Sequence, residues 1–193
     1  MVYPKFDRRT KEGRELYARW DCEAASDSKI LLSEEDYETV EEMAAQVEAH
    51  PIARQLLKGE HEVSIFWTDP DTNVQCKCRP DCLTEYNGQP LIVDYKSTDS
   101  CEDGHFERSC RKYGYRLQSG MYCEGLLQAR MTEYGFAFVA QEKKAPYAVR
   151  VYFCTPEFIG KGYDEFRYLL GLYKDCFLNN SWPGYGQSEL CEE

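Results

Sequence analysis

The 193-residue sequence has no run of the roughly 18 or more apolar residues that a membrane-spanning helix requires, and no cationic segment followed by an apolar one. The first absence excludes a transmembrane helix, and the second excludes a secretory leader at the start of the sequence. Linkers rich in Pro, Gly or Ser, internal repeats and low-complexity tracts are lacking as well. We therefore expect a cytoplasmic protein without a membrane partner, folded as one domain over residues 1–193.

Closely paired cysteines are also lacking, although the chain contains ten cysteines: C-x-x-C occurs nowhere. A zinc or iron–sulfur site with four cysteine ligands needs closely spaced ligands. Cys76 and Cys78 supply half of such a site, and Cys154, Cys176 and Cys191 lie far apart in the sequence. Disulfide scaffolds are typical of small exported domains. Buried free thiols are the favoured interpretation, and a cysteine-ligated metal is the alternative.

Basic residues are outnumbered, since 23 Lys and Arg face 34 Asp and Glu for a net charge of −11. The excess of acidic residues is confined mainly to one segment. Residues 21–48 hold ten acidic side chains against Lys29 alone, for −9, whereas residues 49–188 hold 18 acids and 16 bases, for −2. A low isoelectric point therefore reflects one acidic segment and does not exclude an anionic ligand elsewhere on the chain.

That acidic segment contains the pattern of an amphipathic helix. Ser33 is a typical N-cap, and three acidic residues, Glu34-Glu35-Asp36, occupy the first turn after it. Apolar residues follow at helical spacing, at Tyr37, Val40, Met43, Ala44 and Val47. We expect a solvated acidic face here, within an acidic helical N-terminal portion at about residues 21–58.

Residues outside that helix give a coarse element order. After an irregular start and the acidic helix, we expect a short helix between Pro51 and Gly59 and three antiparallel strands near 61–68, 74–83 and 91–97. A helix at about 105–129, strands near 134–141 and 147–154, and a last helix at about 156–179 complete the order.

The segment CKCRPDCLTEYNGQPLIVDYKST at 76–98 carries the arrangement that folding alone explains least. Asn87-Gly88 predicts a two-residue hairpin turn, so the strands that carry Asp81 and Asp94 should be adjacent and antiparallel. Asp94 and Lys96 share one strand face, whereas the Tyr95 side chain points to the other. If register places Asp81 on the same face as Asp94, the two carboxylates can hold one ion.

Carboxylate pairs bind hard cations such as Mg²⁺, often together with a substrate phosphate. Lys96 beside such a metal can orient, or help to deprotonate, an attacking water. Taken singly, the residues also fit an ordinary hairpin with carboxylates at its strand ends and a surface lysine. The combined pattern P-D, then D-x-K on a hairpin, favours a metal-dependent phosphodiesterase site.

The pattern resembles the PD-(D/E)xK nuclease superfamily. A second motif, Q-x-x-x-Y at Gln118 and Tyr122 in a segment that should be helical, resembles the downstream motif of its RecB-like branch. Four residues apart on a helix, both side chains project from one face and can reach the hairpin. Alone, the pair would fit a half-buried amphipathic helix. The resemblance implies an α/β (α+β) fold with a mixed β-sheet flanked by helices.

Within that superfamily, the chain is most similar to the RecE-type exonucleases (the exonuclease VIII C-terminal nuclease domain) of prophages. The similar segments, in order, are FDRRTKEGRELYARW at 6–20, AHPIARQLL at 49–57, CKCRPD at 76–81, VDYKST at 93–98, QSGMY at 118–122 and WPGY at 182–185. The resemblance implies a Mg²⁺-dependent exonuclease that resects linear duplex DNA 5′ to 3′ from its ends. It also implies recombination with a single-strand annealing protein as partner, and a homo-oligomeric ring.

Roles for individual residues follow from the same resemblance. Asp81, Asp94 and the backbone carbonyl of Tyr95 would ligate Mg²⁺, for which Mn²⁺ can substitute, and Lys96 would position the attacking water. Gln118 and Tyr122 would steady the DNA strand or Lys96, and Glu62 is a weaker candidate for an outer role. The basic residues near the motifs, which could contact phosphates, are Lys77, Arg79, Arg108, Arg111, Lys112 and Arg116.

One difference from the family leaves a second hypothesis open. The family has a helix with a metal-ligating histidine before the FDRRT-like segment, and this sequence begins only a few residues before Phe6. His50, His61 and His105 do not match that histidine, and we expect surface or interface positions for them. The alternative function is a catalytically inactive DNA-end-binding or assembly module derived from such a nuclease.

Overall fold

The structure, a computed structural model, describes residues 7–27 and 29–184, so Phe6, Tyr185 and Cys191 lie outside the described residues. Its helices are α1 (Lys11–Ser26), α2 (Glu34–Ala49), α3 (Ala53–Leu56), α4 (Asp103–Lys112), α5 (Tyr115–Arg130) and α6 (Pro156–Asn179). Its strands are β1 (Glu60–His61), β2 (Ile65–Thr68), β3 (Gln75–Cys78), β4 (Cys82–Tyr86), β5 (Gln89–Thr98), β6 (Gly135–Glu142) and β7 (Val149–Phe153). No helix among these residues is both long and apolar enough to span a membrane.

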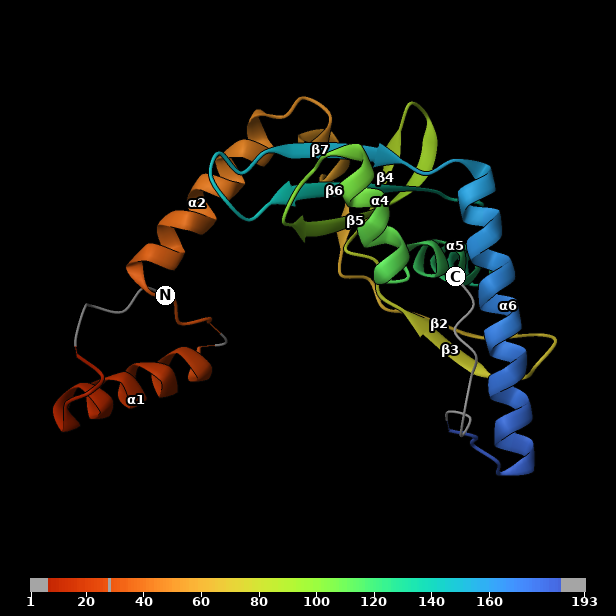
Figure 1. The fold of residues 1–193 in the computed structure, drawn as a ribbon, viewed down its shortest axis with the longest axis horizontal. Coiled ribbons are helices and arrows are strands. Elements are labelled where there is room, and N and C mark those ends of the chain that lie inside the picture. Colours follow the sequence, from red (N-terminus) through yellow and green to blue (C-terminus); the bar gives the residue numbers. More distant parts are fainter. Residues whose placement is uncertain (1–6, 28, 185–193) are drawn as a thin grey trace, which may run out of the picture.

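Five strands form one mixed sheet in the order β1-β4-β5-β6-β7, while β2 and β3 form a separate antiparallel pair. The turn between β4 and β5 is Asn87-Gly88, both with positive φ (53° and 75°), as the hairpin signal predicts. β6 runs parallel to β5, and the crossover between them contains α4 and α5 (Figure 1). The predicted α/β fold, a mixed sheet flanked by helices, is confirmed.

Both faces of the central strands are buried. Along β6, Phe136, Phe138 and Ala140 belong to a core cluster that also contains Leu126 of α5 and Phe166 of α6. The alternate residues of β6 belong to a second cluster on the other face of the sheet, with α3. Each fully buried Phe or Leu stabilises the fold by about 1.5–3 kcal/mol, so these two layers fix the sheet that carries the hairpin.

The predicted strands near 61–68 and 74–83 are wrong in extent, because each is interrupted. Glu62 adopts a positive φ of 55° between β1 and β2. Pro80, which lacks a backbone N–H and cannot extend a hydrogen-bonded ladder, lies between β3 and β4. The chain therefore leaves the main sheet to form the β2–β3 pair and returns to it at β4.

Two helix predictions also need correction. The single helix expected at 105–129 is divided into α4 and α5 by Gly114, whose φ of 67° ends the first helix and redirects the chain. The segment before the acidic helix, which we expected to be irregular, contains α1 after Thr10, whose side chain accepts a hydrogen bond from the backbone N–H of Gly13.

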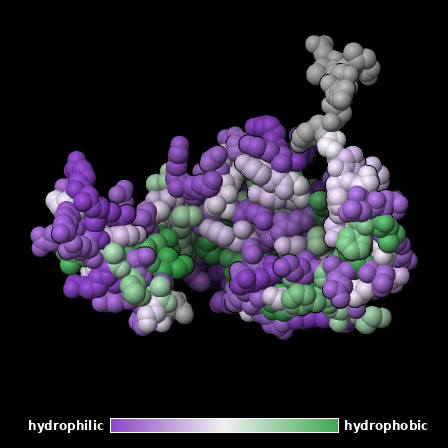
Figure 2. Space-filling model, turned by 90° about the horizontal axis from the view of Figure 1, so that it is seen from below, coloured by the Kyte–Doolittle hydropathy of each residue, from purple (hydrophilic) through white to green (hydrophobic). Residues whose placement is uncertain are grey.

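The acidic helix is present as α2, capped by Ser33, but its apolar face is only partly covered. Tyr37 and Val40 are exposed, whereas Val47 packs against the second core cluster. α2 leads away from the sheet toward α1 (Figure 1), and the surface of this helical region is mostly hydrophilic, with apolar patches toward the body (Figure 2).

Long-range contacts fix α6 against α5 and against the β2–β3 pair. α5 and α6 cross at Gly120 and Gly162, where the backbones approach too closely for a side chain: a Cβ on Gly120 would lie 2.1 Å from the Tyr163 nitrogen. Arg167 of α6 forms ion pairs with the fully buried Asp69 and with Asp71, which follow β2. These contacts fix the position of α5 relative to α6 and the β2–β3 pair.

Candidate functional site

The β4–β5 hairpin brings Asp81 and Asp94 together. Cys82 is the register partner of Val93, so Asp81, one residue before β4, lies beside Asp94. An Asp81 carboxylate oxygen, Oδ2, accepts a 2.8 Å hydrogen bond from the backbone N–H of Tyr95. This bond holds the half-buried Asp81 side chain against β5, on the side where the sequence pattern placed it.

Asp94 is the most unusual residue of the site because its carboxylate is 1% exposed. Its Oδ2 accepts a 2.6 Å hydrogen bond from Nε2 of Gln118, and its Oδ1 contacts Nζ of Lys96 in an ion pair. Oδ1 is nevertheless buried without a hydrogen-bond donor in suitable geometry. Burial raises the pKa of Asp94, the Lys96 charge opposes that rise, and the net direction is upward.

Lys96 lies on the same face as Asp94, with its side chain 19% exposed. Its Nζ is 4.6 Å from the ring centroid of Tyr115, the first residue of α5. The two contacts, one to a carboxylate and one to an aromatic face, fix the ammonium group at the site. Tyr115 was missed in the sequence, although it precedes Gln118 by three residues on the same helical face.

Tyr95 points to the opposite face, where its hydroxyl donates to Oε1 of Gln141. Gln118 and Tyr122 both lie on α5, but Gln118 hydrogen bonds to Asp94 and not to Lys96. Tyr122 is half-buried, and its ring centroid lies 6.4 Å from that of Phe136. Burial raises the pKa of the Tyr122 hydroxyl. The structure thus brings both motifs to one site, with Gln118 in direct contact.

The donor set fits a magnesium ion. Among residues 7–27 and 29–184, no three His, Cys, Asp or Glu side chains are close enough to form a metal site. Mg²⁺, however, is usually held by one or two carboxylates, with water and substrate phosphate as the other ligands. Asp81 and Asp94 meet that requirement, and Oδ1 of Asp94, whose partner in this structure is the Lys96 ammonium, is a carboxylate oxygen that can also ligate a cation.

The structure brings only some of the predicted DNA-contacting residues close to the site. Arg79 directly precedes Pro80-Asp81, and its Nε lies 2.7 Å from a carboxylate oxygen of Glu62. The Glu62 side chain therefore pairs with Arg79, and its backbone N–H donates a 3.1 Å hydrogen bond to the backbone carbonyl of Asp81. Lys77 is exposed on the separate β2–β3 pair.

Two other predicted DNA-contacting residues, Arg111 and Arg116, line a groove between α4, α5 and α6. Arg116 is ion-paired there with Glu165, at 3.2 Å. These four basic side chains therefore lie on different elements, and two of them have acidic partners.

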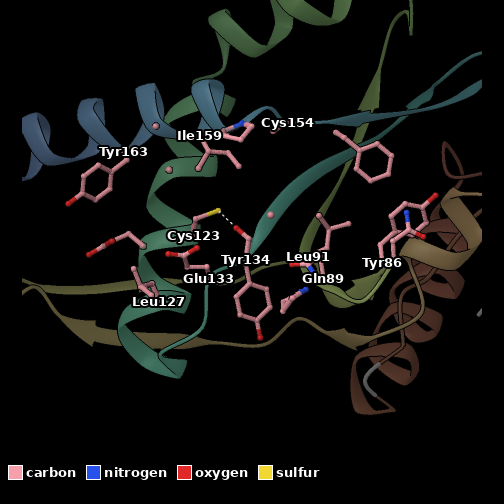
Figure 3. A pocket seen from close by; sticks show the side chains of 18 residues that line it. Tyr86, Gln89, Leu91, Cys123, Leu127, Glu133, Tyr134, Cys154, Ile159 and Tyr163 are labelled. Carbon is pink, nitrogen blue, oxygen red and sulfur yellow. Dashed lines mark hydrogen bonds between the residues drawn. The ribbon is translucent and has the colours of Figure 1, made fainter.

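A larger groove lies elsewhere. It is bordered by the hairpin turn, α5 and α6, and its volume is about 810 Å³ (Figure 3). Its lining is mainly apolar, includes Glu124 and Glu133, and contains none of the predicted site residues. An acidic, apolar groove does not suit a phosphate backbone.

The cysteines and histidines take structural positions. Nine cysteines among the described residues are free thiols, but Cys22 is exposed, so the expectation of buried thiols fails there. Burial raises the pKa of Cys78 to about 12, which makes it unreactive. His50 is half-buried, and its Nδ1 accepts a hydrogen bond from the backbone N–H of Ala53, so it caps α3.

Comparison with solved structures supports this fold. A protein from Eubacterium rectale described as a "Putative exonuclease" matches with a TM-score of 0.61 and 18% identity, over 78% of this chain and 56% of that one. This chain thus spans little more than half of that protein's length. The protein SSO0001 matches with a TM-score of 0.37 and 14% identity, over 65% of this chain and 58% of that one.

Comparison with curated proteins gave no match. A family model does match. It covers residues 6–193 and is described as a PDDEXK-like domain of unknown function, DUF3799. The matched range contains the Pro80-Asp81 and Asp94-x-Lys96 motif and both elements that position it, and on this evidence the chain belongs to the DUF3799 family of PDDEXK-like domains.

Proposed function

We propose that this chain is a metal-dependent DNA exonuclease that hydrolyses phosphodiester bonds from the ends of linear duplex DNA in the 5′ to 3′ direction. The observation that carries the proposal is the buried carboxylate of Asp94, held between Lys96 and Gln118 and next to Asp81. A carboxylate that is desolvated, paired with a lysine and adjacent to a second carboxylate is typical of a catalytic position.

Each residue has a distinct task in this proposal. Asp81 and Asp94, together with the carbonyl of Tyr95, hold Mg²⁺ or Mn²⁺, and Gln118 fixes the orientation of Asp94 through its 2.6 Å hydrogen bond. Such a cation supplies Lewis-acid polarisation of the scissile phosphate. Lys96 positions the attacking water, and the Tyr115 ring limits where its ammonium group can lie. Arg79, directly before Pro80-Asp81, contacts a phosphate of the bound strand.

The finer assignment is to the RecE type, which acts in prophage recombination together with a single-strand annealing protein. The ordered landmark segments along the sequence support it. A homo-oligomeric ring, which would keep the enzyme on its strand, is part of this proposal. An exposed apolar face of α6 supports self-association, since large unpaired apolar patches mark interaction surfaces; it consists of Leu169, Leu172, Tyr173 and Phe177.

The test is degradation of end-labelled linear duplex by the purified protein with Mg²⁺, with Mn²⁺ or with EDTA. We expect cleavage only with a divalent metal, release of the 5′ label as the first product, and no attack on a closed circular duplex. Asp94→Asn should reduce the rate by orders of magnitude, because one of only two carboxylate ligands loses its charge.

A matched control is Glu85→Gln, which neutralises an exposed carboxylate on the same hairpin and should cleave at the wild-type rate. Thermal unfolding of both variants separates loss of chemistry from loss of fold. Protein that binds duplex ends but cleaves none of these substrates with either metal would refute the nuclease proposal and support the inactive end-binding module.

A further inference from the structure

A small polar pocket of about 130 Å³ lies beside the candidate site, where β5 ends beneath α4. It begins at Ser97, the residue after Lys96, and shares the Tyr115 side chain with the site. The side chains that matter for its chemistry are Asp99, His105, Ser109, Tyr113, Tyr115 and Lys143. Because the Tyr115 ring contacts the Lys96 ammonium and also lines this pocket, an occupant of the pocket would lie close to Lys96.

Aromatic rings form one side of the pocket and lead from the core to solvent. Tyr115 packs on the buried Phe106, with ring centroids 6.2 Å apart. Tyr113 in turn stacks on Tyr115, at 5.8 Å between centroids and an interplanar angle of 29°. Tyr113 is 60% exposed. Its other neighbour is Nζ of Lys112, 5.1 Å from the ring centroid, on a flexible side chain that a planar ligand can displace.

The chain break at Gly114 produces this arrangement. A continuous helix from 105 to 129 would place Tyr113 in mid-helix, whereas the positive φ of Gly114 ends α4 and leaves Tyr113 at the junction, next to Tyr115. An exposed ring in this position contributes little to the core, so packing alone does not explain it.

The polar side of the pocket has unsatisfied hydrogen-bonding capacity. Nδ1 of His105 is buried and has no hydrogen-bond partner among the described residues. An unpaired buried polar atom is unfavourable, and a turn of the imidazole ring toward the pocket would let a ligand group of matching polarity pair with it. Lys143 lies 3.7 Å from Asp99, so the one full positive charge in the lining is balanced by a negative one. A neutral polar pocket with an aromatic wall suits a nucleobase better than a phosphate.

We propose that this pocket binds one nucleobase of the DNA strand whose phosphate lies at Asp81 and Asp94. The base leaves the duplex stack, stacks on Tyr113 and presents its polar edge to His105 and Ser109. The inference rests on the proposed function for the identity of the strand. It adds a binding site, with Tyr113 as the residue that determines how the strand end is held before cleavage.

The test uses 2-aminopurine, a fluorescent base that is quenched when it stacks, at successive positions from the 5′ end of a duplex. Binding is measured with Ca²⁺ in place of Mg²⁺, so that no cleavage is needed. We expect quenching at one position near the end in the wild-type protein. Tyr113→Ala should abolish that quenching and weaken binding roughly 5- to 150-fold, the range that corresponds to about 1–3 kcal/mol per stacked base.

Two control variants are compared with Tyr113→Ala. Tyr113→Phe keeps the ring and should retain the quenching, and Tyr168→Ala removes a tyrosine of α6 that is 71% exposed and should leave binding unchanged. A second arm uses the free 2-aminopurine deoxynucleotide 5′-monophosphate. If this nucleotide is quenched in a Tyr113-dependent manner and the duplex is not, the pocket holds released product and the proposal for the strand is overturned.

The outcome is independent of the nuclease assay. If the wild type degrades DNA but Tyr113→Ala shows the same quenching and affinity, the base pocket is refuted and the nuclease assignment stands. If no cleavage occurs but the Tyr113-dependent quenching is present, the base pocket stands and the nuclease assignment fails.

Discussion

Gly120→Ala tests whether the crossing of α5 and α6 controls the candidate site. A methyl group at Gly120 would lie 2.1 Å from the Tyr163 nitrogen and 2.2 Å from the Gly162 carbonyl carbon, whereas ordinary contacts begin at 3.4 Å. The two helices must therefore separate by about 1.3 Å, the difference between 3.4 and 2.1 Å. Overpacking of this kind costs about 1–3 kcal/mol, and more when backbone is involved, which exceeds the gain of about 0.5–1 kcal/mol from a better helix former.

The functional consequence follows from the position of Gln118, two residues before Gly120 on α5. A shift of α5 by about 1 Å lengthens the 2.6 Å bond between Gln118 and Asp94 beyond hydrogen-bond range. Misplacement on this scale can reduce catalysis about 10²-fold. We expect Gly120→Ala to unfold at lower denaturant concentration and, while still folded, to cleave duplex DNA about 100-fold more slowly.

Gly160→Ala provides the matched control, because a methyl group there meets nothing within 4 Å on α6. It should raise the unfolding free energy by about 0.5–1 kcal/mol and leave cleavage unchanged. The reasoning is refuted if Gly120→Ala and Gly160→Ala change the urea midpoint in the same direction, or if Gly120→Ala retains the wild-type cleavage rate.

Three further predictions address the metal site, the fold and assembly. Lys96→Ala should leave Mg²⁺ or Mn²⁺ binding intact or tighter by titration calorimetry, because a neighbouring positive charge is removed, while duplex cleavage falls about 10²–10⁴-fold; full activity would contradict the role of Lys96. Burial alone would raise the pKa of Asp69, but hydrogen bonds from Arg167 and Thr72 have the larger effect and hold that pKa below its usual range. Asp69 therefore stabilises the fold above its ordinary pKa near 3.9, and this contribution should disappear as pH falls through its lower native value. Asp69→Ala should lower the unfolding free energy at pH 7 by roughly 3 kcal/mol and flatten the acid limb of the stability curve. Sedimentation should detect species larger than the 22.5 kDa monomer, and Leu172→Glu with Phe177→Glu should shift them to monomer; a wild-type protein that is monomeric at micromolar concentration would contradict self-association through α6.

The part of the site that could be predicted from the sequence is the part that is local in the chain. Asn87-Gly88 specifies the hairpin, and strand alternation then places Asp94 and Lys96 on one face without information from elsewhere. The four-residue spacing in the downstream helix likewise places Gln118 on the face toward the hairpin. Both inferences need only the geometry of a single element or of two joined by a tight turn.

The parts that could not be predicted depend on distant residues or on a single backbone angle. Asp69 and Arg167 are 98 positions apart, and nothing near either residue identifies its partner. A single glycine in a helical pattern costs only about 1 kcal/mol, so the pattern gave no reason to end the helix at Gly114. Thr10 was a usable capping signal for α1, but the charged residues after it obscure any apolar periodicity.

The burial of Asp94 is the feature that links fold and function most closely. Desolvation and the neighbouring Asp81 charge disfavour the carboxylate of Asp94, whereas the Lys96 ammonium and the hydrogen bond from Gln118 favour it. The pKa of Asp94 is raised overall, so the effects that disfavour the carboxylate are the larger ones. The charged form of Asp94 therefore opposes folding at neutral pH. Asparagine would avoid that cost and still accept the hydrogen bond from Gln118. A buried charge whose attraction to its partner does not offset its desolvation is best explained by a cation that completes the site. The thermal unfolding of Asp94→Asn, already measured as the folding control, should therefore show a protein at least as stable as the wild type.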